Sequence, residues 1–407
     1  MLNNSASAIV LSHGPGGLGT VRTLARCGIR VTAVAYDAGD PVLHSRFPSR
    51  TIPVQGDNDH QKEQHVLGIL HGLPNDESAL MATSDRLVSL ISDHRDGLQK
   101  KFHFKLPSPE TLNALNDKSM ETELIGRLGF DVPKTVSALP AAATALEQQL
   151  RYPIIFKPHS FSKQQVFKRK NEVVWNPEEL QDFYERWEDT LAELLAQEVI
   201  LGPDDNSWVC SCTYNEKYEL LDCLVRQKLR TIPAHFGTST YSISRSNDEV
   251  LELARRLGRK LNYVGHAGIE FRWDDRDSRY KYIELNPRIG GEISFDEACG
   301  LPTVWNSYKV AMGRDAVHSG SMQVNNIYFV NMKQDIASLM QDKTPAMKIV
   351  AIHAALLFRR TSGQFFAWDD PVPGIVVAFR YIVNACRKIF VKIRRTMPAS
   401  KDSQLSN

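Results

Sequence analysis

Cysteine is scarce in this sequence, and the few cysteines show no metal-binding pattern. The 407 residues contain six of them, and none forms a C-x-x-C pair. Cys210 and Cys212 share an alternating run, which predicts that both side chains lie on one face of a strand. We interpret them as structural residues rather than metal ligands. Scattered cysteines are typical of a reducing compartment, so we expect a cytoplasmic protein.

Excess charge of one sign and long apolar runs are also missing. The formal net charge of +2 gives no reason to expect a nucleic-acid partner. The longest apolar stretch, residues 349–358, is about half as long as a membrane-spanning helix. The first residues, MLNNSASAIV, lack the basic start of a secretory leader, and we expect none. These absences leave a soluble globular protein that is long enough for two or three domains.

A glycine-rich stretch near the start, SHGPGGLGT, has the spacing of a dinucleotide-binding turn. Gly14, Gly16 and Gly19 fit the G-x-G-x-x-G pattern between an apolar run and a helix-like run. Asp37 ends the next apolar run, where such domains carry an acidic residue. Three interpretations stay open: an NAD site, a turn whose N–H groups face another anion, or a purely structural turn.

The organisation of the chain follows from its hydrophobic patterns. Residues 1–107 alternate strands and helices, which predicts a small open α/β sheet. Strands are expected at 8–12, 30–36, 51–54 and 79–83, and helices after Gly19, at 59–70 and at 85–90.

A longer α+β segment follows over residues 108–313. Ser108 caps a helix that has Pro109 at its first position, and a second helix runs from Lys118 to Gly129. Two alternating runs around Asn215 predict a hairpin. Residues 314–407 are mostly helical in pattern and basic near their end.

The stretch YKYIELNPRIGGE carries the strongest chemical signal. Its alternating pattern places Glu284 and Asn286 on one face of a strand, and Glu270 comes from another strand upstream. Two carboxylates and an amide oxygen suit Mg²⁺ bound to nucleotide phosphates. Arg288 follows, where its guanidinium can reach a phosphate or carboxylate. The alternative is a strand that ends in an Asn-Pro turn with a surface ion pair.

Two lysines upstream favour an anionic ligand. Lys118 opens a helix, and Lys157 follows the apolar residues Ile-Ile-Phe at the end of a strand. A lysine in that position needs an anionic partner. The alternative for each is an ion pair with a surface carboxylate.

The order of these features resembles the ATP-grasp superfamily of carboxylate–amine ligases. The chain reads D-K, P-x-x-x-K-P, AQEVILGPDD, Glu270 and then E-x-N-P-R. The segments TSDRLVSLIS, KLRTIPAHFGTST and WDDPVPG are most similar to the group that includes D-aspartate ligase. The resemblance implies an α/β ATP-grasp fold: a Rossmann-like domain (1–107), an ATP-grasp domain of two subdomains that clamp ATP (108–313) and a helical extension (314–407).

The resemblance also implies a reaction and its ligands. The enzyme would phosphorylate a carboxylate with ATP and Mg²⁺, or Mn²⁺, and join the acyl phosphate to an amine. Its partners would be small molecules, and a homodimer is possible for such relatives. In this superfamily the Rossmann-like domain usually helps to bind the carboxylate substrate.

Each matching position takes a role from the resemblance. The residues expected to bind ATP, through its phosphates, its base and its ribose, are Lys118, Lys157, Gln197, Glu198, Val199, Ile200 and Asp204. Backbone groups of Glu198 and Ile200 would meet the adenine edge. The metal ligands would be Glu270, Glu284 and Asn286. The residues expected at the reacting groups are Arg288, Lys228 and Arg230.

One departure from the superfamily concerns the segment after Lys157. Many relatives have a glycine-rich lid there, whereas this chain has HSFSKQQVFKRK. Lys163, Lys168 or Arg169 would have to supply charge in place of backbone N–H groups. The alternative is an ATP-binding regulatory protein with a degenerate site, and an NAD-dependent oxidoreductase is a third possibility.

Two further features have competing interpretations. Glu292 is a candidate general base for the amine, or a carboxylate at a helix N-terminus. The C-terminal segment has Ile375, Phe379, Ile382 and Val383 at helical spacing among many basic residues. We expect this apolar face to pack on the body, and contact with an anionic membrane surface is the alternative.

Overall fold

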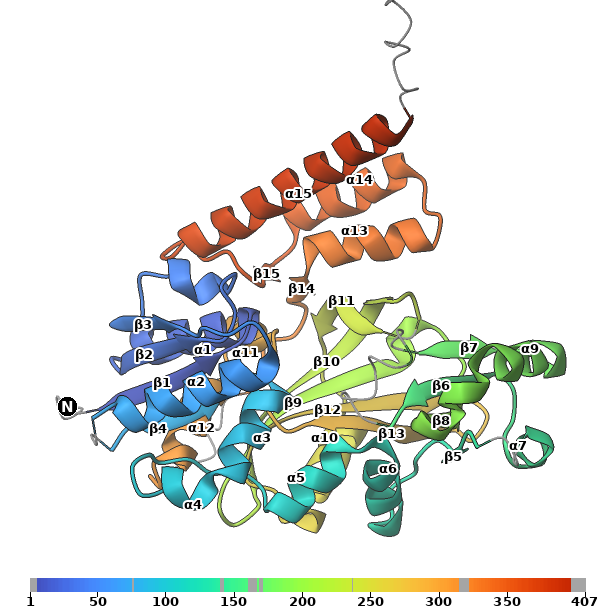
Figure 1. Ribbon diagram of the computed structural model, residues 1–407, viewed down its shortest axis with the longest axis horizontal. Helices are drawn as coiled ribbons and strands as arrows, with labels where there is room; N and C mark the ends of the chain where they lie inside the picture. The colour runs from blue at the N-terminus through green and yellow to red at the C-terminus, as the bar shows by residue number, and fades with distance from the viewer. Residues whose placement is uncertain are drawn as a thin grey trace, which may run out of the picture.

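The computed structural model describes residues 6–74, 77–139, 143–159, 167, 171–235, 237–314 and 322–396. Three sheets form the body, and three C-terminal helices lie along one side of it (Figure 1). The expected mixed α/β architecture is confirmed.

The N-terminal sheet is parallel, with the strand order β3-β2-β1-β4. Its strands and helices are β1 (Ser7–Ser12), α1 (Pro15–Arg26), β2 (Arg30–Ala35), β3 (Arg50–Pro53), α2 (Asp59–Gly72), β4 (Ala79–Ala82), α3 (Asp85–Asp93) and α4 (Arg95–Leu98). All six residues of β1 are buried, as expected of a central parallel strand that is covered on both faces. The side chains of Asn58 and Ser84 cap α2 and α3. The predicted strands and helices of this region are confirmed within a few residues.

The central sheet has seven strands in the order β13-β12-β9-β10-β11-β14-β15. Its first five strands in the chain are β9 (Ser207–Tyr214), β10 (Leu220–Ile232), β11 (Thr238–Ser244), β12 (Gly265–Asp274) and β13 (Arg279–Asn286). The helices of this part of the chain are α10 (Asp248–Lys260), α11 (Ile293–Ala298) and α12 (Thr303–Ala311). The hairpin predicted around Asn215 is confirmed as β9 and β10.

A third, four-stranded antiparallel sheet has the order β5-β8-β6-β7. The elements of this region are α5 (Pro109–Asn116), α6 (Lys118–Arg127), β5 (Thr135–Ser137), α7 (Ala143–Gln149), β6 (Ile154–Pro158), β7 (Glu172–Val174), α9 (Pro177–Trp187) and β8 (Leu194–Glu198). Ser108 caps α5 and Asp117 caps α6, as the sequence indicated for the first of them. The sheet has its own core, in which Phe156 stacks on Phe183 with ring centroids 3.9 Å apart.

The C-terminal segment is more than a set of helices. It contains β14 (Tyr328–Val330), α13 (Met332–Gln341), α14 (Ala346–Ala355), β15 (Thr361–Gly363) and α15 (Val372–Thr396). The strands β14 and β15 extend the central sheet beyond β11. They are only three residues long, which is too short for a periodic sequence signal.

The connector before α15 is anchored in the N-terminal domain. Asp370 is buried and accepts hydrogen bonds from Arg22 Nε at 2.9 Å and from Ser45 Oγ at 2.7 Å. The helix α15 also packs against the 3₁₀ helix Pro41–His44. The predicted ordered connector, WDDPVPG, therefore ties the two ends of the chain together.

The expectation that the apolar face of α15 packs on the body is wrong. Ile375, Phe379 and Ile382 are 58%, 64% and 62% exposed, whereas Val383 is half-buried and Val377 is buried. Arg380 faces inward far enough to donate a hydrogen bond to the carbonyl of Gly39. The helix is therefore rotated so that three of the four predicted packing residues lie outside.

The three segments of the chain are joined in space as well as in sequence. Residues of the loop before α11 and of α11 and α12 share a core with the N-terminal sheet: Ile289, Ile293, Val304, Tyr308 and Ala311. The end of β13 consequently lies at the junction with the N-terminal domain. The division at residues 107 and 313 stays a prediction from the sequence.

Candidate functional site

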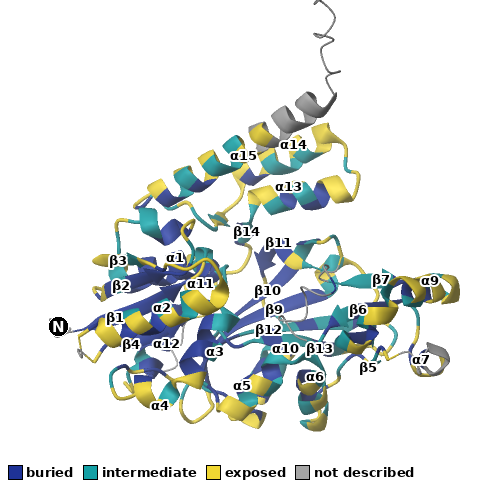
Figure 2. Ribbon diagram, viewed as in Figure 1, coloured by how far each residue is buried: buried dark blue, intermediate teal, exposed yellow. Residues whose placement is uncertain are grey.

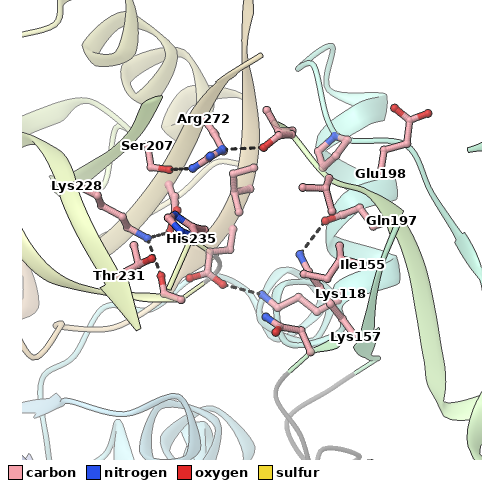
Figure 3. Close-up of a pocket in the computed structure, with 18 of the residues that line it drawn as sticks. Lys118, Ile155, Lys157, Gln197, Glu198, Ser207, Lys228, Thr231, His235 and Arg272 are labelled. Carbon is pink, nitrogen blue, oxygen red and sulfur yellow. Dashed lines mark hydrogen bonds and ion pairs between the residues drawn. The ribbon is translucent and has the colours of Figure 1, made fainter. Parts of the chain in front are cut away.

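A cavity of about 280 Å³ lies between the antiparallel sheet β5-β8-β6-β7 and the central sheet (Figure 3). Most of the candidate residues from the sequence line it: Lys118, Lys157, Gln197, Glu198, Val199, Ile200, Lys228, Glu270 and Glu284. They come from α6, β6, β8 and the segment after it, β10, β12 and β13. The fold therefore gathers residues that are more than 160 positions apart in the chain.

The two candidate metal-binding carboxylates face each other on neighbouring strands. Glu270 of β12 pairs directly with Glu284 of β13, and Gly268 pairs with Asn286. Directly opposed side chains have Cβ atoms about 4.5–5.5 Å apart, which lets both carboxylates reach one ion. Asn286 is close to the pair, since its Nδ2 donates to Glu284 Oε1 at 3.2 Å.

Each of these carboxylates is paired with a lysine. Lys228 Nζ lies 2.6 Å from Glu270 Oε2, and Lys118 Nζ lies 3.6 Å from Glu284 Oε2. Two like charges side by side on a sheet would repel, and the lysines remove that repulsion. A cation and an anionic ligand that bind together can replace both pairs. The carboxylates would then contact the cation, and the lysines would contact the anion.

Lys118 is held in place by a carboxylate that the sequence reasoning missed. Glu121, one helical turn further along α6, is buried and accepts a hydrogen bond from Lys118 Nζ at 3.0 Å. Burial lowers the pKa of Lys118, but Glu121 and Glu284 raise it by more, so the lysine stays charged. Glu121 also accepts from the backbone N–H of Leu285. The i,i+3 spacing to Lys118 was the available signal for it.

Lys157 lies beside Lys118 (Figure 3), whose backbone N–H donates to the carbonyl of His159 at 2.8 Å. It pairs with Leu195 in the β6–β8 ladder, and its Nζ donates to Gln197 Oε1 at 2.8 Å. Gln197 in turn donates to Thr135 Oγ1 at 2.8 Å. Both residues come from strands of the antiparallel four-stranded sheet.

The segment after β8 forms the far end of the cavity. The side chain of Glu198 turns to Arg151, which donates to Glu198 Oε2 from Nη2 at 2.9 Å. The N–H of Glu198 donates to the carbonyl of Lys134, and the carbonyl of Ile200 accepts from Arg272 Nε at 3.0 Å. Arg272 lines the cavity and was missed, because a lone arginine on a strand carries no sequence signal.

Asp204 lies behind the cavity wall rather than in it. Its carboxylate lies 3.1 Å from His235 Nδ1 and accepts from Thr231 Oγ1 at 3.3 Å. His235 and Thr231 line the cavity, whereas Asp204 is not among the described lining residues. The structure therefore places two further polar side chains between Asp204 and the cavity.

Arg230 points away from the cavity. Its guanidinium forms two hydrogen bonds of 2.8 Å with the carboxylate of Asp335, a buried residue of α13. It also lies over the ring of Tyr241, 4.4 Å from the centroid. Irregular register of β10 against β11 at Lys228 and Arg230 breaks the alternation that the sequence suggested. Of the two alternatives offered by the sequence, Lys228 is the one in the cavity.

Arg288 lies beyond the metal-binding carboxylates, at the junction with the N-terminal domain. Its Nε donates to Asp85 Oδ2 of α3 at 2.9 Å, and its Nη2 is 3.5 Å from Asn286 Oδ1. Glu292 is close by in sequence and forms an ion pair with Arg226 of β10. Neither interpretation of Glu292 included this pair, because Arg226 is 66 residues upstream.

A buried polar network continues from this junction. Asp296 of α11 accepts hydrogen bonds from Ser211 Oγ at 2.6 Å and from Thr303 Oγ1 at 2.8 Å. Burial raises the pKa of Asp296 to about 7. Burial, with a contribution from Arg288, lowers the pKa of the neighbouring His266 to about 3. Asp296 is therefore neutral at mildly acidic pH, where an exposed aspartate is charged. His266 is neutral there as well, where an exposed histidine is charged.

The donor set at β12 and β13 fits a hard cation. Among the described residues, no group of three or more His, Cys, Asp and Glu side chains is arranged to hold a metal ion. The candidate set has only two carboxylates, and the third donor is the amide oxygen of Asn286. All three are oxygen donors, which suit Mg²⁺ when phosphate oxygens and water complete the coordination.

The glycine turn already forms a hydrogen bond with a carboxylate of the protein. Gly14, with φ of +70°, donates its N–H to Asp40 Oδ2 at 3.0 Å, and Ser12 Oγ donates to the same oxygen. A Cβ on Gly17 would lie 1.8 Å from Ser12 Oγ, and one on Gly19 would lie 2.5 Å from Ile293 of α11. The glycines therefore let α1 approach β1 and α11 closely.

The other acidic residue of that region, Asp37, is also engaged. It pairs with Lys62 Nζ at 2.7 Å and with His13 Nε2 at 3.0 Å. Of the candidate lid, Lys163, Lys168 and Arg169 lie outside the described residues.

The comparisons with known proteins agree with this geometry. The family described as carbamoyl-phosphate synthase L chain, ATP binding domain, matches residues 236–318. The chain is 25% identical over 284 residues to the D-aspartate ligase of Enterococcus faecium (strain Aus0004). That match covers 66% of this chain and 68% of the ligase.

Solved structures share the fold at lower sequence identity. A biotin carboxylase-beta-gamma-ATP complex from Campylobacter jejuni superposes with a TM-score of 0.64 at 17% identity, covering 79% of this chain and 74% of the other. An L-amino acid ligase from Bacillus licheniformis superposes with a TM-score of 0.57 at 16% identity, covering 75% and 74%.

Proposed function

Because this chain belongs to the ATP-grasp superfamily, we propose that it is an ATP-dependent ligase that joins a carboxylate to an amine through an acyl phosphate. The superfamily and the fold predicted from the sequence are confirmed by the comparisons. The observation that carries the proposal is the cavity in which Glu270 and Glu284 oppose each other with a lysine on each.

ATP would lie across the cavity between the two sheets. The base would occupy the end formed by residues 198–200, where the carbonyl of Glu198 and the N–H of Ile200 are the backbone groups proposed for its edge. The phosphates would lie beside Lys118 and Lys157, which both line the cavity and are close to each other. His235 and Thr231 take the place proposed for ribose contacts, with Asp204 behind them.

Glu270, Glu284 and Asn286 would hold Mg²⁺, or Mn²⁺ in its place. The bound cation would neutralise the phosphate oxygens on which negative charge accumulates during transfer. Lys228, which is buried beside Glu270, would add a fixed positive charge close to the transferred group. Lys118 stays charged because Glu121 and Glu284 raise its pKa, so it can contact an anionic phosphate throughout.

The carboxylate substrate would bind at the junction with the N-terminal domain. Arg288 and Arg226 lie there, and each is paired with a carboxylate of the protein, Asp85 and Glu292. A substrate carboxylate would compete for one of these guanidinium groups, and the freed Glu292 would accept a proton from the attacking amine. The carboxylate oxygen attacks the γ-phosphorus of ATP, ADP leaves, and the amine then displaces phosphate from the acyl carbon.

The similarity to a D-aspartate ligase supports amino acids or related small acids as substrates. A reducing cytoplasm supplies ATP and suits the cysteines, since Cys27, Cys210, Cys212, Cys223 and Cys299 are all free. A homodimer stays a prediction.

An ATP-binding regulatory protein is the second candidate. It is favoured by the glycine-free segment after Lys157, which offers no backbone cradle of the usual kind. The NAD-dependent alternative loses its support, because Asp40 already accepts from the N–H group that a dinucleotide would need.

The test is release of ADP in the presence of Mg²⁺ with pairs of amino acids and small acids, followed by trapping with hydroxylamine. A ligase releases ADP only with its carboxylate, and hydroxylamine converts the acyl phosphate into a hydroxamate. ATP binding without carboxylate-dependent ADP release across the whole set would support the regulatory alternative instead.

A further inference from the structure

The C-terminal segment exposes an unusual amount of apolar surface. Thirteen of the twenty large apolar side chains that are exposed in the described part of the chain lie between Met332 and Ile382. Phe358 and Trp368 are about 90% exposed, at 91% and 90%, and Leu357 is 83% exposed. Exposed apolar residues that are concentrated in this way mark an interaction surface.

The clearest part of this surface follows one side of α15. Val372, Ile375, Phe379 and Ile382 recur at helical spacing and are each at least half exposed. Figure 2 shows exposed residues recurring along the outer side of this helix. No helix in the described residues is long and apolar enough to cross a membrane, so this stripe is not part of a membrane span.

An aromatic pair extends the stripe at the start of α15. Phe366 and Trp368 lie edge to face with ring centroids 5.0 Å apart. Phe366 is placed next to the helix, since a Cβ on Gly374 would lie 2.9 Å from its backbone. We call the six residues Phe366, Trp368, Val372, Ile375, Phe379 and Ile382 the apolar stripe.

The segment that carries the stripe is basic in sequence. Residues 346–396 contain nine Lys and Arg and two Asp, a net charge of +7, whereas the whole chain carries +2, so the rest carries −5. The two acidic residues are Asp369 and Asp370, and both are engaged by arginines of α1, Arg26 and Arg22. The basic residues of this segment are therefore not neutralised by acidic side chains of their own segment.

We propose that the apolar stripe docks the protein on an anionic lipid bilayer. A helix that exposes aromatic and aliphatic side chains within a segment rich in Lys and Arg is suited to lie in the interfacial plane of such a membrane. The apolar side chains enter the headgroup boundary, and the basic residues are attracted by the negative surface potential. Trp368, at the start of the stripe, is of the type that favours the membrane–water interface.

The charge is what favours a lipid surface over a second copy of this chain. Two copies that met through their stripes would bring two segments of net charge +7 together, and like charges across an interface are unfavourable. A bilayer that contains anionic lipid supplies the complementary charge. The stripe is separate from the cavity, whose lining residues come mainly from α6, β6, β8, β10, β12 and β13.

The test is co-sedimentation of the full-length protein with vesicles. One set contains phosphatidylcholine only, and the other also contains about 30 mol% phosphatidylglycerol. We expect the protein to bind the anionic set, and raising the salt from about 0.1 M to about 0.5 M to weaken that binding. The double variant Ile375→Glu/Phe379→Glu should bind roughly tenfold more weakly or worse.

A matched variant controls for loss of an exposed apolar side chain in general. Trp175, which is 53% exposed and precedes α9, is changed to Glu and should bind vesicles like the unaltered protein. Thermal unfolding checks that the double variant is folded, which is expected because both side chains are exposed. Equal binding to both sets of vesicles, or binding to neither, would overturn the proposal. So would a dimer in solution that the double variant converts to a monomer, because the stripe would then be covered by a second copy.

Discussion

Two regions of this molecule have sequence features typical of nucleotide binding, and they differ in what their polar groups contact. At the glycine turn, the N–H of Gly14 already donates to Asp40, and Gly17 and Gly19 allow close packing of α1. In the cavity, Glu270 and Glu284 are paired with lysines around about 280 Å³ of space. In the first region an N–H group of the turn already has a partner in the protein, whereas the second has charges and volume that a ligand can use.

The difference lies in what surrounds each motif. A glycine turn serves an anion only when its N–H groups are left for that anion, and a neighbouring carboxylate removes this possibility. Lysine–carboxylate pairs that line an open cavity can exchange partners when a phosphate and a cation enter together. A sequence pattern typical of nucleotide binding therefore accompanies close packing in one place and a cavity lined by charges in the other.

The largest expected effect comes from removing one carboxylate of the cavity. Glu284→Gln keeps a hydrogen-bond acceptor for Asn286 but loses the charge that a cation needs. We expect ligase turnover to fall by about 1,000-fold, which corresponds to roughly 4 kcal/mol, with the free energy of unfolding little changed. Steady-state ADP release measures it, with Glu219→Gln in the turn before β10 as the control. Near-normal turnover at saturating Mg²⁺ would exclude Glu284 as a ligand.

At the glycine turn, the expected effect is on stability. In Gly17→Ala the new Cβ would lie 1.8 Å from Ser12 Oγ and 2.8 Å from Ser12 Cα, so α1 must shift. We expect a loss of about 2–3 kcal/mol in the free energy of unfolding. Denaturant titration measures it. Gly68→Ala in α2 is the matched control, since its Cβ meets nothing within 4 Å, and it should stabilise by up to about 1 kcal/mol. Equal effects of the two substitutions would mean that Gly17 has no packing role.

Between the two regions, Asp296 should make stability depend on pH. Its pKa is raised to about 7 in the folded protein by burial, so the folded state holds the proton more tightly than the unfolded state. The resulting stability is present in full below the ordinary pKa of an aspartate, near 4, and is lost as the pH rises to about 7.

Asp296→Asn cannot lose that proton. The variant should therefore gain about 2 kcal/mol relative to the unaltered protein between pH 5 and pH 8, an order-of-magnitude figure. Thermal unfolding at the two pH values measures it, and His266 contributes equally to both proteins. Asp93→Asn, at the exposed end of α3, should show no such gain. A parallel pH dependence of the Asp296 variant and the unaltered protein would contradict the assignment.

The smallest of these effects is expected at Lys157. Lys157→Ala removes a charge that we propose contacts the ATP phosphates, and Gln197 loses its 2.8 Å partner. We expect ATP affinity to fall about tenfold, or roughly 1.4 kcal/mol. Calorimetry with ATP and Mg²⁺ measures it, and Lys260→Ala in α10 serves as an exposed control. Unchanged affinity would place the phosphates elsewhere.

The sequence by itself determined most of the elements and the composition of the cavity. Alternation along β12 and β13 predicted that Glu284 and Asn286 share a face, and Glu270 indeed pairs directly with Glu284. The strand-ending Lys157 and the helix-opening Lys118 were predicted in the same way. Periodicity is a property of neighbours in the chain, so it can be read without a structure.

Only the tertiary structure decided which partner each charged group has. Glu292 pairs with Arg226, Asp335 pairs with Arg230 outside the cavity, and Asp40 accepts from the N–H of Gly14. The tertiary structure also exposes the apolar stripe of α15. Helical spacing alone is equally compatible with a buried face. These contacts depend on which elements pack against each other in space. A contact between residues as far apart as Arg22 and Asp370 produces no local pattern in the sequence from which it could be predicted.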